Sequence, residues 1–409
     1  MPDITEQTKT SKLCPSCRLP IQAVSLSDGQ RADCPRCGKT VYQKSRIKLS
    51  GNLALAVTCL LLLIPAHYYH FITINLFGVT ISASLLSGIT ALSQSGFVSL
   101  ALLVLFCSSV APLAVCIAVV CTHCALHFRW FTLLKRSLWV IRQLKYWVMI
   151  DVFLVSVAIA CFKLQDYASI FIGTGLIALI ILQVLTVLLL CRIDVLQYWN
   201  TWQEESELEH THRSSICTHC QLTQPLGHRC LRCKSKMTPE KQFSLQKPWA
   251  YLITAGIAIF PANLIPISIL TTNGNRTEDT IFSGVVSLVD HDLYGIAVII
   301  FIASILVPFL KIVGLAYILV SVHGSNAFLP HISMRVHSLL KWIGKWSMVD
   351  LFVISIMLTL VDRGQLLHFT PGLGAVAFAV VVVCSILATE SINPQVIWKN
   401  LDQRHEERA

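Results

Sequence analysis

The sequence predicts an all-α polytopic membrane protein, and three observations support this fold class. Of the 409 residues, 54% are hydrophobic and only 13% are charged, whereas a typical soluble domain has ~25% charged residues. The apolar residues form long continuous runs, which excludes the alternating strands of a membrane β-barrel. One pattern of cysteines followed by apolar runs also occurs twice along the chain. We therefore expect helices that cross a membrane in two repeated groups.

Membrane-spanning helices are the first element of this prediction. A helix of ~20 apolar residues crosses the ~30 Å hydrocarbon core of a bilayer. Eight runs approach that length, and they lie at about 51–71, 97–122, 139–162, 168–191, 249–270, 293–322, 340–361 and 371–390. The polar first fifty residues lack the pattern of a cleavable signal peptide, so we expect the first run to remain as an anchor.

The orientation of the spans is predicted from the positions of Lys and Arg, which favour cytoplasmic connections. Most of the 32 Lys and Arg residues fall in the N-terminal segment, in the connections at 123–145, 192–248 and 323–345, and in the C-terminal tail. Both termini and the central linker are therefore predicted to be cytoplasmic. This topology accounts for the formal net charge of +10, and we expect no nucleic-acid partner.

An internal repeat organises the spans. The segment "LLLIPAHY" around Pro65 matches "IAIFPANL" around Pro261, at an offset of 196 residues. Further along, "LKYWVMIDVFLVSV" matches "IGKWSMVDLFVISI" at an offset of 199 residues, which aligns Asp151 with Asp350. Self-similarity of this kind indicates a duplicated unit. Because four spans return the chain to the same side, we expect two parallel four-helix repeats related by an axis along the membrane normal.

The segments between the first two spans of each copy predict small β-sheets on the outer face. Residues 72–81, "ITINLFGVTI", alternate as a strand does. In the second copy, Asn273 and Gly274 follow "ISILTT", and Asn-Gly is a favoured turn of a β-hairpin.

Eight cysteines form two pairs of CxxC motifs, one pair before each group of spans. Two such knuckles can present four thiolates to one tetrahedral Zn²⁺. Disulfides are the alternative, but the predicted cytoplasmic position disfavours them, and a thioredoxin-like site needs a single CxxC on a βαβ frame. We predict two structural zinc ribbons, because four thiolate ligands leave no open coordination position. The predicted ligands are Cys14, Cys17, Cys34 and Cys37 in the first ribbon, and Cys217, Cys220, Cys230 and Cys233 in the second.

These features divide the chain into five predicted regions. Each of the two repeats follows its own zinc ribbon, and a short cytoplasmic tail ends the chain. The regions are zinc ribbon 1 (1–48), transmembrane repeat 1 with four helices (49–192), a linker with zinc ribbon 2 (193–246), transmembrane repeat 2 with four helices (247–391) and the tail (392–409).

Two ionisable residues, Lys163 and Asp166, lie between the third and fourth apolar runs. Counted at ~1.5 Å per residue, they fall near the outer end of the third span, and their spacing would place them on one helical face. Two interpretations remain open, a functional pair at membrane depth and an interfacial turn. The aligned residues of the second copy are Asp362 and Gln365, so the pair is not a structural device common to both repeats.

Lys311 lies well inside the sixth span, where its counterpart in the first copy is Val115. An ammonium group there costs several kcal/mol, so it needs an anion, a water-filled cavity or a lowered pKa. Asp350 is the candidate partner by depth. Serines on the neighbouring spans could complete a polar site, and the predicted members are Ser304, Ser347 and Ser385.

The chain combines paired ribbons and four spans per half with the segments "KYWVMIDVFLVSVAIACFKLQDYA" and "GKWSMVDLFVISIMLTLVDRGQ". In these features it resembles the paraquat-inducible protein A family, especially its LetA (YebS-type) branch. The resemblance covers essentially the whole chain. It implies a multi-pass protein of the Gram-negative inner membrane that works beside a periplasmic tunnel protein built of MCE domains. It further implies transport of phospholipid or another lipophilic substrate, and proton coupling through the polar residues within the spans.

Other functions remain open. The chain could be a non-transporting scaffold that anchors the MCE tunnel, or a membrane protein that acts through thiol redox chemistry in a stress response. We expect no enzyme, because no Ser/His/Asp or paired-carboxylate constellation is recognisable. No GxxxxGK[ST] motif occurs, so we also expect no bound nucleotide.

Overall fold

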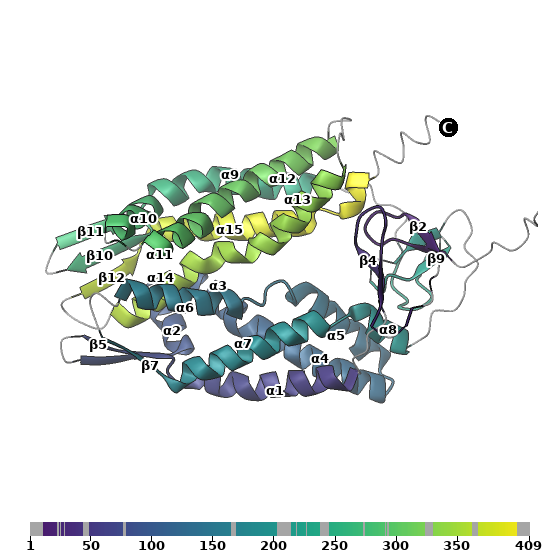
Figure 1. Cartoon of the computed structure of the whole chain (residues 1–409), viewed down its shortest axis with the longest axis horizontal. Coiled ribbons are helices and arrows are strands. Elements are labelled where there is room, and N and C mark those ends of the chain that lie inside the picture. The colour runs from purple at the N-terminus through teal and green to yellow at the C-terminus, as the bar shows by residue number, and fades with distance from the viewer. Residues whose placement is uncertain are drawn as a thin grey trace, which may run out of the picture.

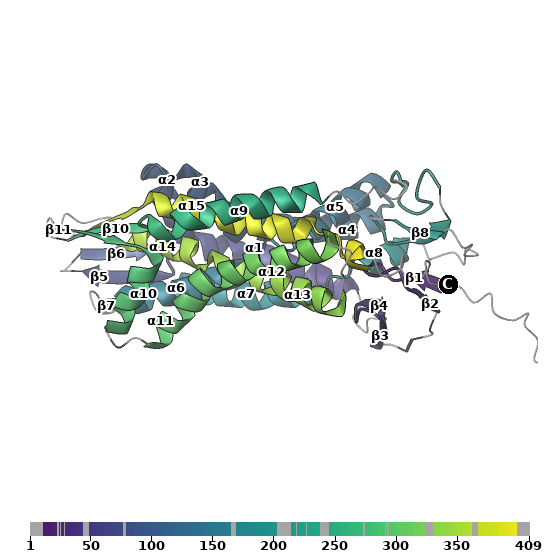
Figure 2. The same cartoon turned by 90° about the horizontal axis from the view of Figure 1, so that it is seen from above.

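The chain folds into an elongated bundle with small β-sheets at one end and the cysteine modules at the other (Figure 1). A computed structural model provides the coordinates. It describes residues 11–43 (except 23, 25 and 28), 49–76, 79–164, 169–202, 214–237 (except 218 and 226), 245–272, 275–323 (except 291 and 293), 330–361 and 367–398. The long helices run along the bundle axis in both views (Figures 1 and 2).

The elements follow the same order twice along the chain. The first set is α1 (Leu49–Tyr68), β5 (Ile72–Leu76), β6 (Val79–Ala83), α2 (Leu85–Gln94), α3 (Val98–Leu105), η1 (Phe106–Val110), α4 (Ala111–His127), α5 (Phe131–Leu144), α6 (Ile150–Leu164), β7 (Ser169–Ile172), α7 (Thr174–Arg192) and α8 (Val195–Trp202). The second set is α9 (Gln246–Leu264), β10 (Ser268–Thr272), β11 (Asn275–Asp279), α10 (Ile281–Asp290), α11 (Tyr294–Ile300), η2 (Phe301–Leu306), α12 (Val307–His323), α13 (Pro330–Ile343), η3 (Gly344–Met348), α14 (Val349–Val361), β12 (Leu367–Pro371) and α15 (Leu373–Ser391).

Within the described part of the chain, five helices are long and apolar enough to cross a membrane. The chain is thus mostly helical, with the small sheets and the cysteine clusters that the sequence predicts. The five candidate spans are Leu49–Tyr68, Val98–His127, Thr174–Arg192, Ala297–Val322 and Leu373–Ser391. Each of the two spans that contain a π-helix, η1 or η2, is longer than the other three.

The third and seventh expected spans differ from the sequence prediction. Instead of continuous runs at 139–162 and 340–361, the chain forms α5 and α13 and then breaks before α6 and α14. The reason is visible in α5, which buries Leu134, Leu138 and Ile141 on one stripe and carries all of its Lys, Arg and Gln side chains outside that stripe, as an amphipathic surface helix does. Each apolar run is therefore divided between a surface helix and a core helix of similar length.

Two three-stranded sheets confirm the predicted β-structure. The order is β6-β5-β7 in the first and β11-β10-β12 in the second, and all pairings are antiparallel. The sequence predicted the hairpins but not the third strands, which come from the segments after α6 and α14. At that junction the chain passes so close to the first strand that a Cβ at Gly173 would collide with the backbone oxygen of His70, and one at Gly372 with that of Pro266.

The two halves meet along α6 and α14. Phe153 packs edge-to-face on Phe352 with 5.6 Å between ring centroids, and the two residues are equivalent at the offset of 199. Contact between equivalent residues is the mark of a two-fold relationship. The buried Ser156 hydroxyl also crosses this interface and donates to the Val349 carbonyl at 2.9 Å.

This interface predicts a measurable coupling between the halves. We expect Phe153→Ala and Phe352→Ala each to destabilise the chain, because each leaves a cavity in a packed core. The double variant should be less destabilised than the sum, by about 0.5–1.5 kcal/mol, the value of an aromatic pair. Unfolding of the detergent-solubilised protein and its three variants checks this. Additive losses would show that the rings are energetically independent.

The first cysteine module consists of β1 (Ser11–Leu13), β2 (Pro20–Gln22), β3 (Arg31–Asp33) and β4 (Thr40–Gln43). It precedes the first half in sequence but docks on the second half. The Arg18 guanidinium donates to the Gln395 side chain at 3.2 Å, and Arg36 lies over the Trp398 ring at 4.5 Å. Its buried cysteines share an apolar cluster with α12 and α13.

The second module, with β8 (Ser214–Ile216) and β9 (Thr223–Pro225), docks on the first half. Arg232 donates to the Asn200 side chain at 2.9 Å, and the Lys234 amine lies 5.7 Å from the Phe131 ring centroid. The modules also touch each other, because the Leu13 amide donates to the Thr223 hydroxyl at 3.4 Å. The modules are thus exchanged between the halves.

Candidate metal centres and a buried lysine

The first module brings its four cysteines together. The Sγ atoms of Cys14 and Cys37 are 3.5 Å apart, as are those of Cys17 and Cys34, and all four lie within 4.8 Å of one another. A tetrahedron of thiolates around zinc, with Zn–S bonds of ~2.3 Å, has edges of ~3.8 Å. The four side chains fit a tetrahedral metal ion of that size.

The second module repeats this arrangement with all four thiols buried. The Sγ atoms are 3.4 Å apart in the pair Cys217 and Cys233 and in the pair Cys220 and Cys230. The Ser235 hydroxyl lies 2.7 Å from the Cys233 sulfur. A hydroxyl at this distance can orient a metal-bound thiolate, as outer hydrogen bonds do in structural metal sites.

All four knuckles share one backbone turn. In each, the residue after the second cysteine has a positive φ and donates its amide proton to the carbonyl of the first cysteine. These residues are Arg18, Gly38, Gln221 and Lys234, with φ of 60°, 69°, 58° and 52°. The left-handed conformation is costly for residues other than glycine, so its recurrence indicates that the geometry of the four thiols is maintained by the fold.

The protonation of these thiols couples metal binding to pH. Burial raises the pKa of the Cys37 thiol to about 11, so this side chain is a neutral thiol near neutral pH without a metal. A metal ligand must be a thiolate, so metal binding releases protons.

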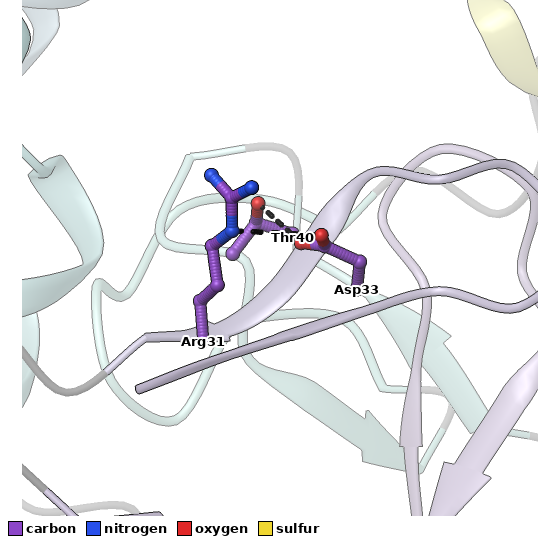
Figure 3. A network of polar contacts seen from close by, with 3 residues as sticks. All are labelled: Arg31, Asp33 and Thr40. Atoms are coloured by element: carbon purple, nitrogen blue, oxygen red, sulfur yellow. Dashed lines mark hydrogen bonds and ion pairs between the residues drawn. The ribbon is translucent and has the colours of Figure 1, made fainter. Parts of the chain in front are cut away.

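Outside the cluster, the Asp33 carboxylate on the β3–β4 hairpin accepts a hydrogen bond from the Thr40 hydroxyl at 2.7 Å and lies 3.7 Å from the Arg31 guanidinium (Figure 3). This network is exposed, so its contribution to stability is small.

Lys311 is the most deeply buried Lys or Arg side chain among the described residues, with 1% of its surface exposed. It projects from α12, and its amine donates to the Ser385 hydroxyl of α15 at 2.5 Å. Ser385 in turn donates to the Val382 carbonyl at 2.9 Å. The sequence predicts a polar site of Lys311, Asp350, Ser304, Ser347 and Ser385. Of these residues, Lys311 and Ser385 are joined by a direct hydrogen bond.

Two further predicted serines are buried near this pair. Ser304 in η2 is 3% exposed and Ser347 in η3 is 1% exposed, and neither hydroxyl has a hydrogen-bond partner within the described residues. Elements η2, η3, α12 and α15 pack on one another. Buried hydroxyls are nearly always paired, so these two mark a place where water or a further polar group is needed.

The first half lacks an equivalent site. The counterparts of Lys311 and Ser347 are the buried valines Val115 and Val148. Ser108, the counterpart of Ser304, donates to the Val104 carbonyl at 2.7 Å. The first copy thus has valine where the second has Lys311 and Ser347, which indicates that these two polar side chains are not needed to build the fold.

Gly344 leaves space beside the lysine. A Cβ at this position would lie 4.0 Å from the Lys311 amine. Gly344 also lines a cavity of about 30 Å³ between the halves, with Tyr146 and Met149 on one side and Thr389 and Glu390 on the other. A cavity holds a water when it offers ≳10–15 Å³. By volume alone this one has room for a water molecule beside Gly344, whose other side faces the Lys311 amine.

Comparison with known proteins decides the family. A sequence model of paraquat-inducible protein A matches residues 49–203 and 245–402. The chain belongs to the paraquat-inducible protein A family. The two matched segments begin at the first residue of α1 and just before α9, so the family model covers both repeated sets of elements and leaves out both cysteine modules.

Other members of the paraquat-inducible protein A family are similar over nearly the whole chain. "Lipophilic envelope-spanning tunnel protein A" of Escherichia coli K12 is 35% identical over 400 residues, which cover 94% of this chain and 90% of that protein. A "probable intermembrane transport protein" of Haemophilus influenzae is 33% identical over 95% of this chain and 96% of its own length. "Intermembrane transport protein PqiA" of E. coli K12 is 29% identical over 97% of both. No solved structure matches the chain.

The remaining predicted site residues of this family member are placed only in part. Asp166 lies outside the described residues. Lys163 lies in the last turn of α6 and Asp350 in the first turn of α14, but their side chains are not among those described. The predicted interfacial turn at Lys163 and the predicted pair with Asp166 therefore both remain predictions.

Sequence reasoning missed two features of the polar interior. Gly344 carries no chemical signal of its own, and only its neighbours in space reveal its role. The second is His67 in α1, whose Nε2 lies 2.8 Å from the Ser109 hydroxyl of η1 and whose Nδ1 lies 2.8 Å from the Leu63 carbonyl. Its position two residues after Pro65, inside an apolar run, was the available signal.

Proposed function

We propose that the chain is an inner-membrane component of an intermembrane phospholipid transport system, and that it loads or unloads lipid for a periplasmic tunnel of MCE domains. The observation that carries the coupling part is Lys311, a fully buried amine within a candidate membrane span. The names of the relatives, an envelope-spanning tunnel protein and intermembrane transport proteins, support the transport part. They also favour a non-enzymatic role.

The proposed topology has eight membrane helices in two parallel repeats. The five long apolar helices are joined by α9, of 19 residues, and by α6 and α14. The last two are short, at 15 and 13 residues, but they pack on each other between the halves. In this arrangement both termini and both cysteine modules are cytoplasmic. The sheets face the periplasm, where a tunnel partner can dock. The proposed regions of the chain end at residues 48, 192, 246 and 391, and the tail follows the last of them.

The proposed metal is zinc, one ion in each module. The eight ligands are the cysteines of the two clusters, which fit a tetrahedral ion in size and number. When bound, zinc would crosslink the knuckles and supply folding free energy without an open coordination position. Its proposed role is structural.

The proposed mechanism couples protonation to the interface between the halves. Protonation of Asp166 or Asp350, coupled to Lys163 and Lys311, would drive a conformational change that loads lipid into the periplasmic partner. Ser304, Ser347 and Ser385 would provide hydrogen-bonding groups around Lys311. Gly344 and Ser347 belong to η3, which leads directly into α14, and α14 holds Phe352 against Phe153. A change of charge at Lys311 therefore acts on the element that joins the two halves.

A transport assay with carboxylate variants tests this proposal. Asp350→Asn and Asp166→Asn should each reduce transfer of labelled phospholipid roughly tenfold or more, the effect of losing about 1.4 kcal/mol of coupling free energy. Asp151→Asn is the matched control, because Asp151 occupies the position of Asp350 in the first copy, and it should transfer lipid as the unaltered protein does. The assay uses full-length protein in vesicles together with its tunnel partner.

The scaffold alternative makes the opposite prediction. A chain that only anchors the tunnel would tolerate both carboxylate substitutions and would lose function only when the sheet end is altered. Full transfer by Asp350→Asn and Asp166→Asn would therefore remove the proposed coupling.

A further inference from the structure

A second pocket lies where α5 meets α8 and the second cysteine module. Its volume is about 210 Å³, and its lining includes Lys135, Arg142 and Gln143 of α5, Trp199 of α8 and His219 of the module. Pockets that enclose a whole drug-sized ligand measure roughly 300–1,000 Å³. The smaller volume suits one polar group, such as a headgroup, and excludes a complete lipid with its acyl chains.

The lining is rich in donors and cations. Lys135 and Arg142 contribute two positive charges, and among the residues that the structure describes no Asp or Glu lines the pocket. Trp199 is 2% exposed, and its indole N–H has no hydrogen-bond partner within the described chain. Lysine and arginine side chains bind phosphate through charge-assisted hydrogen bonds. The pocket is therefore suited to an anion, and phosphate matches its donors.

The pocket lies at the depth of the membrane surface. Helix α5 follows the candidate span Val98–His127, and α8 follows the candidate span Thr174–Arg192. Trp130 and Trp139 on and beside α5 are 57% and 53% exposed, and tryptophan is enriched at membrane–water interfaces. This is where the phosphate groups of phospholipids lie.

The second copy has Lys341 and the buried Trp398 at the positions of Arg142 and Trp199, but it shows that module docking does not require a lysine at the position of Lys135. Helix α13 is the counterpart of α5 at an offset of 199, and it carries Met334 where α5 has Lys135. Met334 is buried in the cluster that it shares with the first module. Apolar packing is thus sufficient to seat a module on this helix, and the lysine of the first copy needs another explanation.

We propose that this pocket binds the phosphate group of an anionic phospholipid headgroup, on the side of the membrane next to the cysteine modules. Lys135 and Arg142 neutralise the phosphate, and Gln143 and Trp199 add neutral donors at the pocket wall. The site is proposed for the first half because the second has Met334 at the position of Lys135, and it does not rest on proton coupling or on lipid transport.

Native mass spectrometry of the detergent-solubilised full-length protein tests the site. The probes are dioctanoyl phosphatidylglycerol, dioctanoylglycerol, which lacks the phosphate, and inorganic phosphate. We expect Lys135→Met, which installs the residue of the second copy, and Arg142→Gln to weaken phosphatidylglycerol binding roughly tenfold or more, the effect of losing a charge-assisted hydrogen bond. Lys135→Arg should keep binding. Arg136→Gln is the matched control, because it removes an exposed charge from the same helix outside the pocket.

Each arm has a deciding outcome. Lost binding in Lys135→Met and Arg142→Gln, with unchanged melting temperature and full binding in Arg136→Gln, supports the pocket. Equal binding by all variants, or equal binding of dioctanoylglycerol, overturns it. Binding of inorganic phosphate in place of phosphatidylglycerol overturns the lipid source. None of these outcomes depends on whether the chain transports lipid, so the proposed function fails or survives separately.

Discussion

Lys311→Met is expected to abolish phospholipid transport and to leave the protein as stable as before, or more stable. An ionised lysine near the centre of a membrane helix costs ~2.5–3.5 kcal/mol, and methionine fills a similar volume without that cost. The Ser385 hydroxyl keeps its bond to the Val382 carbonyl, so the substitution leaves no new unpaired group there. Lipid transfer and thermal unfolding, measured on the same preparation, check the two halves of the expectation.

Ser385→Ala is the comparison for this result. It removes the acceptor of the Lys311 amine while the buried amine remains, and leaving a buried donor unsatisfied costs about 1–3 kcal/mol. This variant should therefore lose both stability and transport. If Lys311→Met transported lipid normally, the coupling mechanism would be wrong. If it melted well below the unaltered protein, the lysine would be a structural residue, and its loss of transport would not support coupling.

Cys217→Ser is expected to produce the largest loss of local stability in the chain. Strands β8 and β9 have only three residues each, so this module has little ordered structure without a bound ion. A structural zinc site contributes an apparent ~10–16 kcal/mol of binding free energy. The metal content should fall from two zinc ions per chain to one, measured by elemental analysis, and the module should become sensitive to protease.

Cys124→Ser provides the control for thiol loss. Cys124 belongs to a CxxC motif at the end of α4 and is exposed, and it lies in neither four-cysteine cluster. Its substitution should leave two zinc ions bound and the protease pattern unchanged. Retention of both ions in Cys217→Ser would contradict the proposed ligand set.

Much of this architecture could be predicted from the sequence because its signals are local or repeated. The CxxC spacings located all eight thiols of the clusters, and continuous apolar runs located the long helices. The hairpins were predictable from alternation and from the Asn-Gly turn, since both depend on neighbouring residues. The repeat supplied a comparison inside a single chain, and that comparison identified Lys311 as an exception at a position where the first copy has Val115.

The features that escaped prediction depend on contacts between distant residues. The third strands β7 and β12 pair with strands almost a hundred residues earlier, and no short sequence pattern predicts such a pairing. The apolar run around Trp139 was assigned to a span, although the amphipathic stripe of Leu134, Leu138 and Ile141 begins before it. The role of Gly344 and the exchange of the modules depend on how the two halves pack in space, which no local pattern records.

The exchange of modules has a consequence for biosynthesis. The first module is translated first, but Arg18 finds its partner Gln395 only 377 residues later. At roughly 5–20 residues per second, the ribosome needs roughly 20–75 s to produce that partner. During this time the module's cysteines are already outside the ribosome while the surface that covers them does not exist. Early acquisition of a metal ion would protect these thiols through the interval, and the earliest part of the chain is then among the last to reach its final contacts.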